Sequence, residues 1–205
     1  LGLDRRMCGM GLAEADLDGD SVPELFHSSW LELRLLGTLG TELWVDFAAP
    51  AGIRVQEDLQ RHVAWGADFG DVDHDGDLDL WVGFGAIAAN IENPWAQPDA
   101  LWIRQDLQFV ERAFPWGVAD LRRTRGGMLV DVDADGQLDL IKRNKDAIPE
   151  LNLASCRNGH WLSLQLRDDT LNTRGVGARI RVLEDPVPQT RWIRAGGRSI
   201  GSAGP

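Results

Sequence analysis

The sequence predicts an all-β fold, and the residues around three acidic loops carry this prediction. Apolar and polar residues alternate at 78–82 and 137–141, and a period of two is typical of strands. Small and apolar residues lead into the same loops at 66–70 and 125–130. The sequence therefore predicts a recurring unit of strand, acidic loop and strand, with little helix.

The acidic loop occurs three times in the same phase, as loop 1 (residues 16–24), loop 2 (71–79) and loop 3 (131–139). Carboxylates recur at loop positions 1, 3, 5 and 9, and position 7 adds a backbone carbonyl. A tight turn with this spacing directs the oxygens inward, into the oxygen-only shell that calcium prefers. The sequence thus predicts up to three Ca²⁺ sites, with the ligands Asp16, Asp18, Asp20, Val22 and Glu24; Asp71, Asp73, Asp75, Asp77 and Asp79; and Asp131, Asp133, Asp135, Gln137 and Asp139.

Two other interpretations of the loops are weaker. Solvated turns are one, because Asp-Gly is common in turns, but three copies in one phase favour metal sites. The EF-hand is the other, and it needs a bidentate acid at position 12. That position holds His27, Val82 and Lys142, which excludes the EF-hand.

Loop 1 is the weakest of the three candidate sites. Its Gly19 stands between ligands rather than after the third one, and Pro23 stiffens the approach to position 9. Glu24 at that position has a longer side chain than aspartate and must retract to bind.

Further segments recur outside the loops. Residues 43–48 follow loop 1, and residues 101–104 with 109–111 follow loop 2; each set leads to a glycine turn, at 51–53 and 116–118. We interpret them as the outer strands of each unit. The loop starts are 55 and 60 residues apart, a little above the roughly 40 to 50 residues of common propeller blades.

The small-residue strand, the D-x-D-x-D-G-x-x-D-L loop and the apolar strand after it resemble the FG-GAP/VCBS-type calcium-loop repeats of integrin-like β-propellers. The resemblance covers residues 1–155 and implies about three blades, at 1–55, 56–118 and 119–155. Propellers need about four or more blades to close. We therefore expect the remaining blades in a longer parent chain, and Leu1 in place of Met favours a processed or excised fragment.

Residues 156–205 carry a second resemblance. The segments 158–166 and 172–182, above all the Asn-x-Arg-Gly-x-Gly-Ala-Arg run, resemble the ASPIC/UnbV region that follows such repeats in the cartilage acidic protein family. The chain ends at Pro205, short of the Phe-Gly-Leu-Gly segment usual there, so we expect a β-rich but truncated tail. Together the two resemblances imply a calcium-binding propeller that is secreted, periplasmic or on the cell surface.

The net charge of −11 originates in the loops. They hold 13 of the 32 acids, which leaves 19 against 21 Lys and Arg, and three Ca²⁺ ions would bring the formal charge to −5. A nearly neutral remainder argues against nucleic acid as a partner. The sequence shows no membrane span.

The sequence contains no catalytic motif. Its four histidines stand in neither an H-E-x-x-H motif nor a G-x-S-x-G context. One hypothesis is a non-enzymatic, calcium-stabilised module for adhesion or interaction with a protein or glycan. The alternative is an accessory, non-catalytic part of a larger secreted carbohydrate-active enzyme. No acid/base pair can be separated from the metal ligands, which favours the first.

The nine tryptophans suggest where a partner would bind. Trp30, Trp95 and Trp116 lie near predicted turns, and exposed Trp can stack on sugars or anchor protein contacts. We interpret Trp44 and Trp102 as equivalent structural residues of two units.

The two cysteines, Cys8 and Cys156, have neither metal nor redox spacing. A disulfide between them and two separate buried thiols both remain open.

Overall fold

The computed structural model describes residues 2–4, 6–30, 32–40, 42–55, 62–87, 97–119, 121–155, 159–183 and 188–195. Within these ranges the chain forms 13 strands and no helix, so the predicted all-β fold is confirmed. The strands are β1 (Gly9–Ala15), β2 (Glu24–Ser29), β3 (Leu33–Thr38), β4 (Trp44–Asp46), β5 (Ala64–Gly70), β6 (Asp79–Phe84), β7 (Ala100–Gln105), β8 (Gln108–Glu111), β9 (Thr124–Val130), β10 (Asp139–Asn144), β11 (Glu150–Asn152), β12 (Arg179–Val182) and β13 (Gln189–Trp192).

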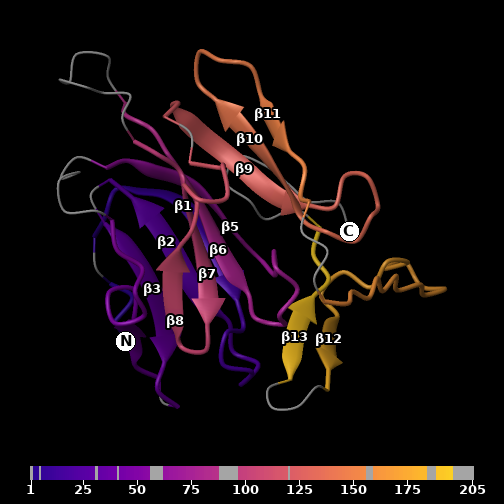
Figure 1. Cartoon of the computed structure of the whole chain (residues 1–205). Coiled ribbons are helices and arrows are strands. Elements are labelled where there is room, and N and C mark those ends of the chain that lie inside the picture. Colours follow the sequence, from indigo (N-terminus) through magenta and orange to yellow (C-terminus); the bar gives the residue numbers. More distant parts are fainter. Residues whose placement is uncertain are drawn as a thin grey trace.

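The strands form four antiparallel sheets (Figure 1). Two are four-stranded meanders with the orders β1-β2-β3-β4 and β5-β6-β7-β8; the third has the order β9-β10-β11, and β12 pairs with β13. Loop 1 joins β1 to β2, loop 2 joins β5 to β6, and loop 3 joins β9 to β10. The predicted unit of strand, acidic loop and strand is therefore confirmed at all three places.

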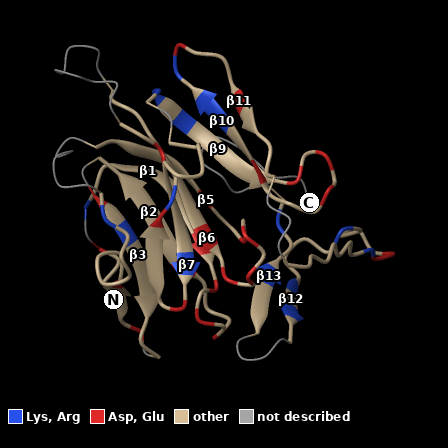
Figure 2. Cartoon of the chain, viewed as in Figure 1, with Lys and Arg blue, Asp and Glu red and all other residues tan. Residues whose placement is uncertain are grey.

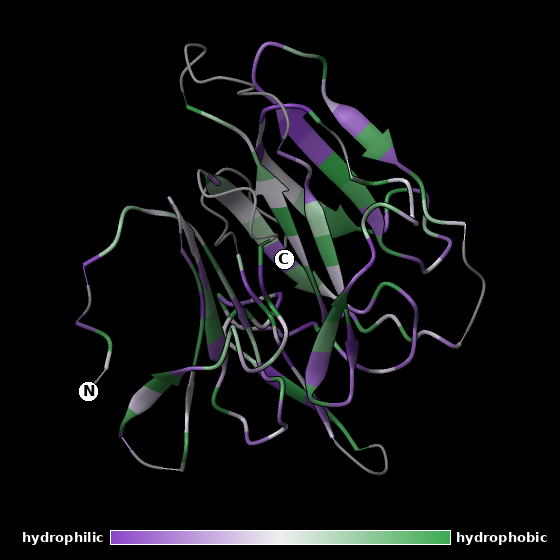
Figure 3. Ribbon diagram, turned by 60° about the vertical axis from the view of Figure 1, so that its left-hand side comes forward, coloured by the Kyte–Doolittle hydropathy of each residue, from purple (hydrophilic) through white to green (hydrophobic). Residues whose placement is uncertain are grey.

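The second sheet lies between the first and the third, and β6 shows why. All six residues of β6 are buried, so both of its faces are covered. Leu80 and Val82 pack with Phe26 of the first sheet, whereas Trp81 packs with Leu129 of β9. Successive residues of a strand point to opposite faces, so one strand supplies two cores. Figure 3 shows apolar residues distributed along the strands of these layers.

Glycines let the first strands of the three sheets approach one another. β5 contacts both β1 and β9. A Cβ on Gly66 of β5 would lie 2.8 Å from the Cα of Gly126 on β9, too close for any side chain. On the same strand, Asp68 accepts a 2.7 Å hydrogen bond from the Leu129 amide. The strands that lead into the three loops are thus held side by side.

The same kind of turn follows the outer strand of each of the first two sheets. The Ile53 amide donates to the Ala48 carbonyl and the Val118 amide to the Ala113 carbonyl, both at 2.9 Å. A left-handed glycine precedes each donor. The glycine turns predicted at 51–53 and 116–118 are therefore present.

The predicted equivalence of Trp44 and Trp102 is wrong. Trp44 is half-buried on β4, the fourth strand of its sheet, whereas Trp102 is buried on β7, the third strand. By register, Trp44 corresponds to Phe109 of β8, because each lies one residue before a valine that pairs with the third strand. The shared Leu-Trp pair suggested an alignment that the strand order does not support.

The described sheets do not close into a ring. The blade assignment and the boundaries at 155 and 156 therefore stay predictions. In the described part of the tail, β12 and β13 are the only strands, and residues 160–168 lie outside any strand.

The remaining predictions concern single tryptophan and cysteine residues. Trp30 and Trp116 are exposed, as expected of candidates for a binding surface, and Trp95 lies outside the described residues. Cys8 is exposed, so a buried thiol is wrong for this residue. Its proposed disulfide partner, Cys156, lies outside the described residues.

Candidate metal centres

The three loops share one set of hydrogen bonds. In each loop the position 2 amide donates to the position 9 carboxylate, the position 6 amide to position 1, and the position 7 amide to position 5. The N···O distances are 2.8–2.9 Å, 3.0–3.1 Å and 2.6–2.9 Å for the three bonds in turn. The backbone therefore wraps around its own carboxylates in the same way in all three loops.

Each loop contains two residues in the left-handed region. At position 4, Gly19, His74 and Ala134 have φ of 78°, 58° and 64°; at position 6, Ser21, Gly76 and Gly136 have φ of 74°, 95° and 92°. Each loop places glycine at one of the two positions, where the absence of Cβ removes the steric cost. Gly19 is therefore suited to loop 1, and its strain falls on Ser21 instead.

The carboxylates at positions 1, 3 and 9 come together in every loop. In each group the three ligand atoms lie within 4.8 Å of one another, and the groups are Asp16, Asp18 and Glu24; Asp71, Asp73 and Asp79; and Asp131, Asp133 and Asp139. The structure thus forms three carboxylate groups that could hold a metal ion.

The structure does not gather the remaining predicted ligands into these groups. The position 5 carboxylates of Asp20, Asp75 and Asp135 are exposed, and one oxygen of each accepts the position 7 amide. The position 7 carbonyls of Val22, Asp77 and Gln137 belong to the residues that donate these amides. A role for positions 5 and 7 in metal binding therefore stays a prediction.

Burial makes these carboxylates costly to ionise in the absence of a cation. Desolvation, together with the charge of the neighbouring carboxylates, raises the pKa of Asp79 to about 8, that of Glu24 to about 7 and that of Asp73 to about 6. A divalent cation among them would remove this penalty.

One buried oxygen atom of loop 2 has no hydrogen-bond partner, and a bound metal ion would supply one. Asp73 Oδ1 is buried and accepts no hydrogen bond. Buried polar atoms are almost always paired, so an oxygen of this kind needs an explanation. It belongs to the group formed with Asp71 and Asp79, and a cation there would satisfy it. The donor set of carboxylate oxygens fits Ca²⁺.

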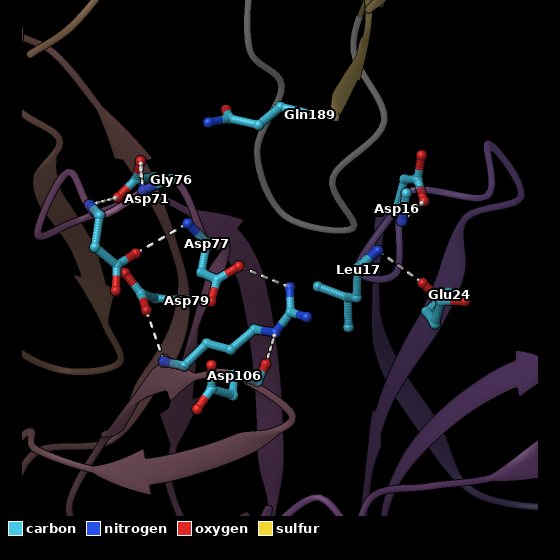
Figure 4. A network of polar contacts seen from close by, with 12 residues as sticks. Asp16, Leu17, Glu24, Asp71, Gly76, Asp77, Asp79, Asp106 and Gln189 are labelled. Carbon is cyan, nitrogen blue, oxygen red and sulfur yellow. Dashed lines mark hydrogen bonds and ion pairs between the residues drawn. The ribbon is translucent and has the colours of Figure 1, made fainter. Parts of the chain in front are cut away.

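Glu24 reaches its group without displacing a neighbour, because β3 carries a glycine beside it. A Cβ on Gly37 would lie 3.1 Å from Glu24 Cγ and 3.2 Å from Glu24 Oε1. The extra methylene of glutamate therefore occupies space that a side chain at residue 37 would fill. Leu17 donates its amide to Glu24 Oε2 at 2.8 Å, as in the aspartate loops (Figure 4).

The position 9 aspartates also connect each loop to the rest of its sheet. The second oxygen of Asp79 accepts the Arg104 amide of β7, and that of Asp139 accepts the Ala154 amide after β11, both at 2.8 Å. A single side chain thus joins the start of the loop, the second strand and the next segment of the sheet. Sequence reasoning missed Arg104, whose side chain also lies 3.3 Å from Asp77.

Comparison with known proteins gives no assignment: no family model matches the chain, and no curated protein matches it. Among the described residues, no helix has the length and apolar character that crossing a bilayer requires.

Proposed function

We propose that this protein is a calcium-binding module, secreted or exposed at a cell surface, in which the metal supports the structure. Its three meander sheets act as blades of an integrin-like β-propeller, completed by further blades of a longer chain. Its output is binding to a protein or glycan, and it is not an enzyme.

The observation that carries this proposal is the threefold grouping of carboxylates at positions 1, 3 and 9. Their position 9 members are buried, with exposed fractions of 8%, 0% and 2% for Glu24, Asp79 and Asp139. Buried acids of this kind need a compensating charge, and no Lys or Arg side chain is hydrogen-bonded to them in the described structure.

Calcium suits the groups better than the alternative metals. All the donors are hard oxygens, without the thiolate or imidazole that zinc favours. Magnesium keeps several waters and demands octahedral geometry, whereas calcium accepts six to eight oxygens in irregular shells. Loops with additional carboxylate and carbonyl oxygens at positions 5 and 7 can supply that number.

Two features support binding rather than catalysis as the output. The second oxygens of Asp79 and Asp139 accept backbone amides from neighbouring segments of their own sheets, which supports a structural role for a metal bound to these residues. Trp30 and Trp116 present exposed indole rings, with 48% and 39% exposure, that suit contact with a protein or a sugar.

Calorimetric titration with calcium, together with thermal unfolding in calcium and in chelator, tests the proposal. For an affinity of about 10⁻⁴ M, millimolar calcium should add roughly 1.5 kcal/mol of stability per site. Asp79→Asn and Asp139→Asn should each remove one site. In chelator each variant should lose only the one backbone amide hydrogen bond that asparagine Nδ2 cannot accept, so its loss of stability should be clearly larger in calcium.

Asp106→Asn is the matched control. It removes the same charge from a turn between β7 and β8 outside the carboxylate groups, and asparagine tolerates its left-handed backbone. It should leave the calcium response unchanged. Equal losses with and without calcium in the Asp79 and Asp139 variants would show that the loops are not metal sites.

A further inference from the structure

The C-terminal residues of the chain lie against the acidic loops. Gly159 lies so close to the main chain of His74 that no side chain would fit there, and the Trp161 indole lies against Gly136 in the same manner. A Cβ on Gly76 would lie 3.1 Å from Gln189 Nε2, and Figure 4 shows the Gln189 amide directed toward Gly76. One part of the tail therefore touches loops 2 and 3.

Two arginines of the tail interact with acidic side chains of the sheets. Burial lowers the pKa of the Arg191 guanidinium on β13, and the negative charges of Asp71 and Asp16, the position 1 residues of loops 2 and 1, act against this shift. Arg194 forms an ion pair with Glu14 of β1. Figure 2 shows acidic segments beside the β12–β13 hairpin, which carries basic residues. Contacts thus join the tail to loops 2 and 3 and to β1, and the charge of Asp16 in loop 1 also acts on Arg191.

These contacts fall at loop positions 4 and 6, where the backbone is left-handed. The amides of Gly76 and Gly136 donate to the position 1 carboxylates Asp71 and Asp131, at 3.1 and 3.0 Å. The peptides that the tail covers are therefore held by the carboxylates of the metal groups. Any change in loop conformation must change the surface that the tail meets.

We propose that the loop edge of the three sheets is an interaction surface whose occupant is the chain's own tail, residues 159–183 and 188–195, and that calcium in the loops stabilises this docking. The coupling to calcium rests on the function proposed above. The docking itself does not.

The fixed backbone of the loops decides the direction of the coupling. Loops 1 and 3 each carry four carboxylates, and loop 2 carries a fifth at Asp77, so one bound Ca²⁺ leaves formal charges of −2, −3 and −2 on loops 1, 2 and 3. Calcium therefore weakens the attraction of Arg191 to the loops but does not remove it. Calcium also fixes the loop backbone against which Trp161 and Gln189 pack, and this effect favours docking.

Hydrogen exchange of the whole chain, followed by mass spectrometry in millimolar calcium and in chelator, tests the proposal. Peptides covering 159–167 and 188–195 should exchange several-fold more slowly in calcium. Arg191→Gln and Trp161→Ser should abolish that difference in their own segments, while calorimetry still detects the same number of calcium ions. Arg181→Gln, an exposed arginine on β12 of the same hairpin, is the matched control and should behave as the parent.

The outcomes separate the two proposals. Fast exchange of the tail under all conditions, with calcium binding intact, would overturn the docking surface. A protected tail that ignores bound calcium, or one that calcium releases, would overturn the coupling. If calorimetry detects no calcium binding, the metal proposal fails, and faster tail exchange in Arg191→Gln than in Arg181→Gln would still support the docking.

Discussion

At the scale of single residues, the arrangement of carboxylates in the loops depends on left-handed backbone as well as on the acidic side chains. Positions 4 and 6 are left-handed in all three loops, yet the residues there include His74, Ser21 and Ala134. Left-handed backbone costs a residue with Cβ roughly 1–2 kcal/mol. In each loop the position 6 amide donates to the position 1 carboxylate, five residues earlier, and this hydrogen bond offsets part of the strain.

We predict that Ala134→Gly stabilises the protein by about 0.5–1 kcal/mol, the relief of strain less the added entropy of the unfolded chain. Urea unfolding measures the change. Ala154→Gly, at a residue outside the left-handed region, should destabilise instead. If both substitutions destabilise equally, the loop conformation is not strained.

The raised pKa values predict opposite effects of pH with and without calcium. The folded pKa of Asp79 is about 8 and that of Glu24 about 7, both above the values of 3.8 and 4.5 for the free side chains. The metal-free folded state thus holds more protons than the unfolded state between about pH 4 and 8, so its stability falls as pH rises through this window.

Calcium competes with these protons, so the stability gained from calcium should increase from pH 5.5 to pH 8. Urea unfolding at both pH values, in calcium and in chelator, measures the gain. A calcium effect that is the same at both pH values would mean that these carboxyls are not ligands.

At the scale of the elements, a buried ion pair joins the second and third sheets. Lys142 Nζ of β10 lies 3.4 Å from Asp99 Oδ2, and both side chains are fully buried. Asp99 also accepts the Phe84 amide and the Thr124 hydroxyl, at 2.8 and 2.9 Å. Glu150 of β11 lies 3.2 Å from the same ammonium.

We predict that Lys142→Met destabilises the protein by about 3–5 kcal/mol, because it leaves Asp99 buried without its cation. Asp99→Asn in the same chain should restore part of the loss. A double-mutant cycle by urea unfolding measures the coupling. Additive losses in the double variant would show that the two residues do not stabilise each other.

At the scale of the whole molecule, the stacked sheets expose apolar residues on their outer faces and edges within the described part of the chain. Strand β6 of the second sheet is covered on both sides, whereas Leu12 on the outer face of the first sheet (β1–β4) is 51% exposed and Leu151 on the edge strand β11 is 51% exposed. Uncapped stacks and open sheet edges favour association.

We predict that the protein self-associates as its concentration rises, and that Leu12→Lys weakens this association. Sedimentation velocity over a range of concentrations measures it. Leu171→Lys, in a fully exposed turn of the tail, is the control and should change nothing. A monomer at every concentration would contradict the expectation that the first sheet has an open face.

The pattern of residues within each segment was sufficient to predict the strand–loop–strand units. Apolar and polar residues alternate with a period of two in the strands, and the carboxylates recur at loop positions 1, 3, 5 and 9. It also identified the nine residues that the structure gathers into three groups. These features depend on neighbours within one loop, so a single segment of sequence carries them.

The tertiary structure decided what depends on distant segments. Gly37, on another strand, leaves space for the Glu24 side chain, and strand register shows that Trp44 corresponds to Phe109. The charges of Asp71 and Asp16 act on Arg191, which lies more than a hundred residues later in the sequence. Such partners have no fixed spacing in the sequence, because the order of strands and the stacking of sheets bring them together. The sequence therefore determines which residues can bind a metal, and the packing of the sheets and tail determines what surrounds them.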